Sequence, residues 1–146
     1  MKKLNNKSGF TMVELVMVIV IIAVLASGVI SANKAIENSR VVQQIQNIKV
    51  VHSAAVQWYG DKMAYSGISV DELKNNGYLK NNFDSTKANQ FGGDLTVAVD
   101  PADQEKYIFT LTKVSDSART KLENGLSNST DNFSYDDKNQ TWTATF

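Results

Sequence analysis

A nearly unbroken apolar run from Phe10 to Ile30 constrains this chain more than any other feature of its sequence. An α-helix needs about 20 apolar residues to cross the hydrocarbon core of a bilayer, so the run predicts a membrane-spanning helix. One carboxylic acid, Glu14, interrupts it near its start. Because an ionisable group inside a membrane segment is costly, Glu14 is a candidate functional residue that needs a partner.

Basic residues precede the run: Lys2, Lys3 and Lys7 come before any acidic residue. By the positive-inside rule, residues 1–9 are expected in the cytoplasm and the rest of the chain outside. Two simpler interpretations compete. One is a secretory signal peptide cleaved near Ser27, and the other is a plain membrane anchor. Both leave Glu14 unexplained.

The composition narrows the functional classes. The chain has 146 residues, enough for one ordinary domain, with no net charge and no cysteine. Without cysteine there is no disulfide and no thiolate metal site, and without a basic cluster beyond the leader no nucleic-acid footprint is evident. No supported Ser/His/Asp grouping, histidine pair or phosphate-binding glycine loop is present, so we expect no enzyme, no catalytic residue and no cofactor.

Beyond the apolar run, the chain keeps a helical pattern as far as Gly60. Apolar and aromatic positions recur at steps of three and four, as on one face of an amphipathic helix: Val41, Ile45, Ile48, His52, Ala55 and Tyr59. The opposite face is assigned to polar side chains: Gln43, Gln44, Gln46, Asn47 and Lys49. The pattern predicts one helix from Phe10 to about Tyr59, with an apolar half (10–30) and an amphipathic half (31–60) that packs on a globular part. His52, the one histidine, is expected to be packed and hydrogen-bonded, without a chemical role.

Residues 61–146 read as a small α+β head. Ser69 and Gly77 are predicted to cap a short helix, with Glu72 in a capping box. Strands are expected from Asp94 and from Lys106, followed by a helix over 115–126. A closing hairpin is expected from residues 133–135 and 141–146. The predicted architecture is a small antiparallel sheet on the long N-terminal helix.

Two features of the C-terminal tail suggest weaker possibilities. Asp131, Asp136 and Asp137 form an oxygen-rich stretch of the kind that holds Ca²⁺, although a solvated hairpin turn is favoured because no full EF-hand spacing is present. Asn128, Asn132 and Asn139 each begin an N-x-[ST] sequon. In a tail this rich in Asn, Ser and Thr, chance explains the sequons better than glycosylation.

The stretch "KSGFTMVEL" resembles the class III signal of type IV pilins and pseudopilins. The resemblance implies that a prepilin peptidase cuts between Gly9 and Phe10, that the new Phe10 amine is methylated, and that the apolar helix is retained. In a filament core, Glu14 would meet the amine of a neighbouring subunit's Phe10. Leaving either buried charge unpaired costs several kcal/mol, so the pair would fix the axial register between subunits.

The order of the head segments is similar to that of type IVb major pilins, in "ELKNNGYL", "FGGDLTV", "YIFTLTKV" and "KLENGL". Such pilins usually carry two cysteines that staple the C-terminal region, whereas this chain has Ala118 at the aligned helix position. The short leader ending at Gly9 and the first mature residue Phe10 look more like the type IVa group. A calcium loop, by contrast, is a feature of the major pseudopilins of type II secretion.

The resemblance implies a structural subunit that polymerises through its helix into a type IV pilus, with roles in adhesion, motility or DNA uptake. Its expected partners are other copies of itself in a helical filament, the prepilin peptidase, and the inner membrane with the pilus assembly machinery. It would lie in the inner membrane before assembly and in an extracellular filament afterwards. The alternatives are a type II secretion pseudopilin and a monomeric membrane-anchored binding domain.

Overall fold

A computed structural model describes residues 12–146, with only the backbone described for residues 27–31. The chain divides after Ile36 into two units, the second being Glu37–Phe146. Helix α1 (Met12–Lys62) supplies all of the described part of the first unit and the first segment of the second. From here on, the head is the second unit, which also includes part of α1. Its α-helices and antiparallel sheet confirm the α+β prediction.

Within the head, α1 buries one face against the sheet. Val41, Ile48 and Ala55 of the predicted stripe are buried, with Val51 and Trp58 beside them. The helix ends at Lys62 rather than near Tyr59, because Gly60 does not interrupt it. It stops at Met63, which adopts a left-handed conformation (φ 59°) and donates its N–H to the Tyr59 carbonyl at 2.8 Å.

The polar face assigned to α1 is wrong at Gln44. This side chain is completely buried, and its Oε1 accepts a hydrogen bond from the backbone N–H of Gln90 at 2.8 Å. Asn47 is half-buried and donates its Nδ2–H to the Ala88 carbonyl at 2.7 Å. Both amides satisfy backbone groups of a loop that packs on the helix, which explains why polar side chains occupy positions facing the protein.

Two short helices connect α1 to the sheet. Helix α2 (Val70–Asn75) begins at the predicted cap, where Ser69 Oγ accepts from the Glu72 N–H at 3.1 Å. It ends before Gly77, whose φ of +81° is the left-handed value that glycine adopts most easily. Helix α3 (Ser85–Ala88) was not predicted. Asp84 caps it by accepting from the Thr86 N–H at 3.0 Å.

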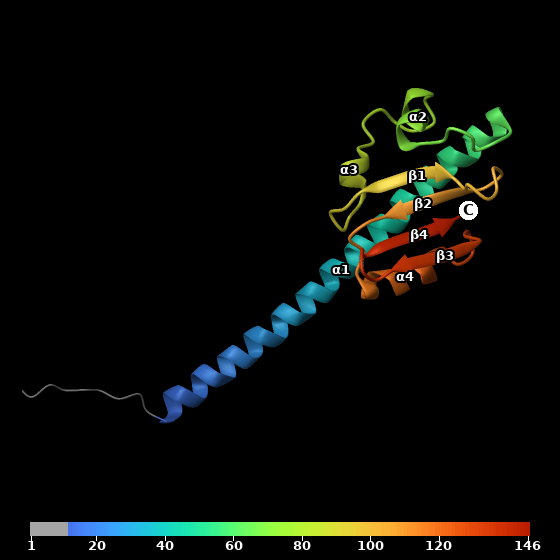
Figure 1. Ribbon diagram of the computed structural model, residues 1–146. Helices are drawn as coiled ribbons and strands as arrows, with labels where there is room; N and C mark the ends of the chain where they lie inside the picture. The colour runs from blue at the N-terminus through green and yellow to red at the C-terminus, as the bar shows by residue number, and fades with distance from the viewer. Residues whose placement is uncertain (1–11) are drawn as a thin grey trace, which may run out of the picture. The chain divides into compact units, whose positions relative to one another are not determined.

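Four antiparallel strands form the sheet in the order β1-β2-β4-β3. They are β1 (Leu95–Val99), β2 (Tyr107–Leu111), β3 (Asn132–Asp136) and β4 (Thr141–Thr145). The last strand therefore pairs with both β2 and β3, for example Phe109 with Ala144 and Ala144 with Phe133. Figure 1 shows α2 and α3 at the β1 edge and α4 at the β3 edge.

Helix α4 (Asp116–Leu126) confirms the helix expected after β2, with Ser115 as its cap. It buries Ala118, Leu122 and Leu126. On its other side, Lys121 Nζ donates to Asn38 Oδ1 of α1 at 2.7 Å. Helix α4 therefore packs on the core and is also hydrogen-bonded to α1.

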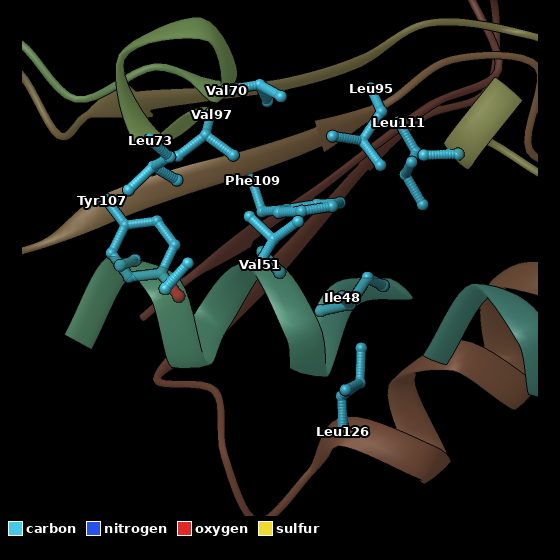
Figure 2. Close-up of a cluster of buried hydrophobic side chains, with 14 of the residues drawn as sticks. Ile48, Val51, Val70, Leu73, Leu95, Val97, Tyr107, Phe109, Leu111 and Leu126 are labelled. Atoms are coloured by element: carbon cyan, nitrogen blue, oxygen red, sulfur yellow. The ribbon is translucent and has the colours of Figure 1, made fainter. Parts of the chain in front are cut away.

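The core lies between the sheet and α1. Figure 2 shows Tyr107 and Phe109 of β2 on the side facing α1, with Val51 near Phe109 and Leu126 of α4 beneath Ile48. At the C-terminal end, Trp142 is completely buried and its ring centroid lies 5.7 Å from that of Phe133. Aromatic packing thus holds the C-terminal region, where no cysteine is present.

The turn before β1 requires glycine at position 93, because the backbone there lies close to that of Thr112. A Cβ built on Gly93 would lie 2.3 Å from the Thr112 carbonyl oxygen, closer than real contacts allow. We therefore predict that Gly93→Ala lowers the free energy of unfolding by about 1–3 kcal/mol. Guanidinium titration of tryptophan fluorescence measures this. Gly60→Ala, where a Cβ meets nothing within 4 Å, is the control and should not destabilise the head.

Candidate functional site

The predicted processing residues, Gly9 and Phe10, lie outside the described residues. Glu14 is described, and it lies in the first turn of α1 with an exposed side chain. A carboxylate in the first turn is favoured there by the helix dipole, whose positive end is at the N-terminus. The backbone thus presents Glu14 at the beginning of the apolar half of the helix.

The apolar half of α1 exposes its side chains on every side. All large apolar residues between Met12 and Leu25 are exposed, from 48% for Val18 to 86% for Met12. Because they occupy consecutive positions, they cover the whole circumference of the helix rather than one stripe. A surface of this size and uniformity marks an interaction site, since soluble monomers rarely expose large contiguous apolar patches.

Among the residues that the structure describes, no helix combines the length and the apolarity that crossing a membrane requires. The predicted membrane segment starts at Phe10 and extends to Ile30, so its first two residues are outside this range and the side chains of its last four are not described.

His52 is packed and hydrogen-bonded, as predicted. Its Nδ1 lies 2.6 Å from the Tyr107 hydroxyl, and its ring centroid lies 5.0 Å from that of Phe146. Burial lowers the pKa of the imidazole below its ordinary value of 6.5 and raises the pKa of the Tyr107 hydroxyl. Both groups are therefore neutral at pH 7, and the contact joins α1 to β2.

The lowered pKa of His52 predicts a pH dependence of stability. The neutral imidazole contributes stability that is fully present above pH 6.5 and is lost as the pH falls through its lower pKa in the folded state. Unfolding titrations between pH 7 and pH 5 should therefore show a falling free energy in the parent protein. His52→Gln should show a smaller fall over this range. Asp84 and Asp136 do not interfere, because their pKa values lie below 3.8.

The three acidic residues of the suggested calcium loop are not brought together. Asp131 precedes β3 and Asp136 ends it, which places them about 17 Å apart along an extended strand. Asp131 forms an ion pair with Lys106 at 2.9 Å, and Asp136 accepts from Asn139 Nδ2 at 2.7 Å. Within residues 12–146, no group of three acidic, histidine or cysteine side chains is arranged to hold a metal ion.

The acceptors of the three sequons are all exposed. Asn128 lies in the turn after α4, Asn132 begins β3, and Asn139 lies in the turn between β3 and β4. Exposure is usual for polar residues in turns and edge strands, so their positions give no support to glycosylation.

A groove between α1 and residues 78–90 has no signature in the sequence. Its walls come from segments separated by more than twenty residues, and Gln44 and Asn47 bind the loop to the helix. Polar side chains on a helix show the same sequence pattern whether or not a loop packs beside them, so the pattern does not reveal the groove. The amide-rich run from Gln43 to Asn47 is the available signal, and its pattern predicts only the polar face of the helix.

Comparison with known proteins bears on the N-terminal segment. Residues 4–30 match the family described as the prokaryotic N-terminal methylation motif. This match supports the resemblance of the N-terminal segment to the signal of type IV pilins and pseudopilins, and a motif of this family indicates a structural protein. The motif implies processing by a prepilin peptidase and pilus assembly. No curated protein matches the chain significantly.

Proposed function

We propose that this protein is a subunit of a type IV pilus, which inserts in the inner membrane, is cut after Gly9, and polymerises through the apolar half of α1. The head, Glu37–Phe146, then forms the filament surface and carries roles in adhesion, motility or DNA uptake. Support comes from the methylation motif at residues 4–30 and from the fold of the head.

The observation that carries this proposal is the apolarity of α1 on all sides. Met12–Leu25 would have water around every face in an isolated soluble chain. Burial of such a helix stabilises by about 25 cal/mol for each Å² removed from water. A bilayer removes it from water before assembly, and neighbouring helices do so in a filament core.

Glu14 gives the assembly its register in this proposal. Cleavage after Gly9 creates a cationic amine on Phe10, four residues before Glu14 and about one helical turn away. In a core without water, each charge needs a partner of opposite sign. The carboxylate of one subunit and the amine of the next satisfy each other at one axial offset only.

Electron microscopy of sheared surface material tests the filament role. Cells that express the parent protein should yield filaments labelled by an antibody against the head. Cells with a Gly9→Val variant, which blocks the cut, should keep the protein in the membrane and yield none. Labelled protein confined to the envelope of parent cells, without filaments outside, would favour the secretion pseudopilin instead.

A further inference from the structure

The groove beside α1 has the dimensions of a ligand site. It lies within the head, between the amphipathic half of α1 and residues 78–90, and has a volume of about 690 Å³. Binding sites for small molecules usually measure about 300–1,000 Å³. The two walls of the groove are also held together, because Asn47 donates to the Ala88 carbonyl at 2.7 Å and so fixes the loop to the helix.

Carboxamides on both walls offer unused hydrogen-bonding groups. Gln57 lies on the α1 wall and Asn82 on the loop wall, and both are exposed. Among the described residues, neither side chain has a hydrogen-bond partner. A carboxamide presents a donor and an acceptor side by side, which matches the paired hydroxyl groups of a sugar ring.

Aromatic rings supply the apolar part of the lining. Phe83 and Tyr78 line the groove and are half-buried. Tyr78 is fixed in place, because its hydroxyl donates to Asp61 Oδ2 at 2.6 Å and its ring meets that of Trp58 edge-on at 5.9 Å. Rigid rings beside carboxamides suit a ligand with one apolar face and polar edges.

The charged side chains that line the groove favour an acidic ligand. Asp84, its one carboxylate, caps α3 through the Thr86 N–H at 3.0 Å and pairs with Lys87 at 3.3 Å. Lys80 lines the same groove and, among the described residues, forms no ion pair. The lining therefore carries one uncompensated positive charge, which favours an anionic ligand.

We infer that the groove binds an acidic saccharide, a short chain of uronic acid units. Lys80 pairs with a uronate carboxylate, Gln57 and Asn82 bind ring hydroxyls, and Phe83 packs against the apolar face of a sugar ring. This binding goes beyond the proposed filament role and does not depend on it, since each head contains a whole groove.

Calorimetric titration of the full chain in non-ionic detergent, with a hexamer of galacturonic acid, tests the inference. The parent protein should bind the hexamer, and binding should weaken as salt rises. Lys80→Gln should weaken binding about tenfold, as expected for the loss of a charged hydrogen bond. Asn82→Ala should weaken it as well. The matched control is Lys138→Gln, in the exposed turn between β3 and β4, and it should bind like the parent.

Three results would overturn the inference. They are no binding by the parent protein, equal weakening by Lys138→Gln and Lys80→Gln, and equal affinity for a neutral glucose hexamer or a glutamate hexapeptide. Both Lys80 and Asn82 are exposed, so the variants are expected to fold, and tryptophan fluorescence checks this. Because the assay uses dispersed protein, its failure would leave filament assembly untouched.

Discussion

Glu14→Ala should abolish filaments while leaving processing and membrane insertion intact. The substitution leaves the Phe10 amine of the neighbouring subunit without its carboxylate in a core that excludes water. Breaking a buried ion pair by removing one partner costs about 3–5 kcal/mol. Because the loss recurs at every subunit, the filament should not form. Filament counts in sheared material, with immunoblots of the membrane fraction, measure both parts of the prediction.

Two further variants sharpen the test of Glu14. Glu14→Gln keeps the shape of the side chain and removes its charge, so it should be as defective as the alanine variant. Glu105→Gln removes a carboxylate from an exposed loop between β1 and β2 and should leave filaments at parental numbers. Normal filaments from Glu14→Ala would exclude a role for this residue in assembly.

Phe109→Ala should cause one of the largest losses of stability among single substitutions in the sheet. Phe109 is completely buried in β2, a strand paired on both sides, and it points toward α1 (Figure 2). Truncation of a buried phenylalanine costs about 3–5 kcal/mol. Guanidinium titration of the full chain in non-ionic detergent measures it, since Trp58 and Trp142 are both buried in the head.

The neighbouring position in the same strand provides the control. Thr110 is half-buried and lies on the other face of the sheet, between Thr96 and Thr143. Thr110→Ala should cost about 1 kcal/mol or less, which is the range of strand propensities. Equal losses from the two variants would mean that the register assigned to β2 is wrong.

The fold was predictable wherever a local pattern carried the information. Ser69 and Ser115 mark helix starts because a hydroxyl at these positions satisfies backbone N–H groups that the helix itself leaves open. The alternation in β2 buries Tyr107, Phe109 and Leu111 on one face, as period two requires.

Long-range contacts were harder to predict. The pairing of β4 with both β2 and β3 depends on the path of α4 between them, which no local pattern specifies. The pattern places Gln44 on the polar face because its amide is polar, whereas in the fold the amide oxygen accepts from the backbone N–H of Gln90. The short helix α3 was missed because its four residues are too few for periodicity to be detected.

The candidate sites likewise differ in whether a local pattern could reveal them. Gly9, Phe10 and Glu14 are consecutive parts of one linear motif, so the sequence alone was enough to propose them. The groove is made by distant segments, and its residues became visible only when the loop was seen against α1. The acidic residues of the C-terminal tail show the opposite case, because Asp131 and Asp136 are near in sequence but lie at opposite ends of a strand.

Mass spectrometry of the N-terminal peptide tests the central claim most directly. The protein should be taken from native membranes or sheared surface material and digested. The account predicts a mature chain that begins at Phe10 and carries a methyl group on its amine. A chain that begins at Met1, or one cut near Ser27, would contradict the account and leave an anchored or secreted binding domain.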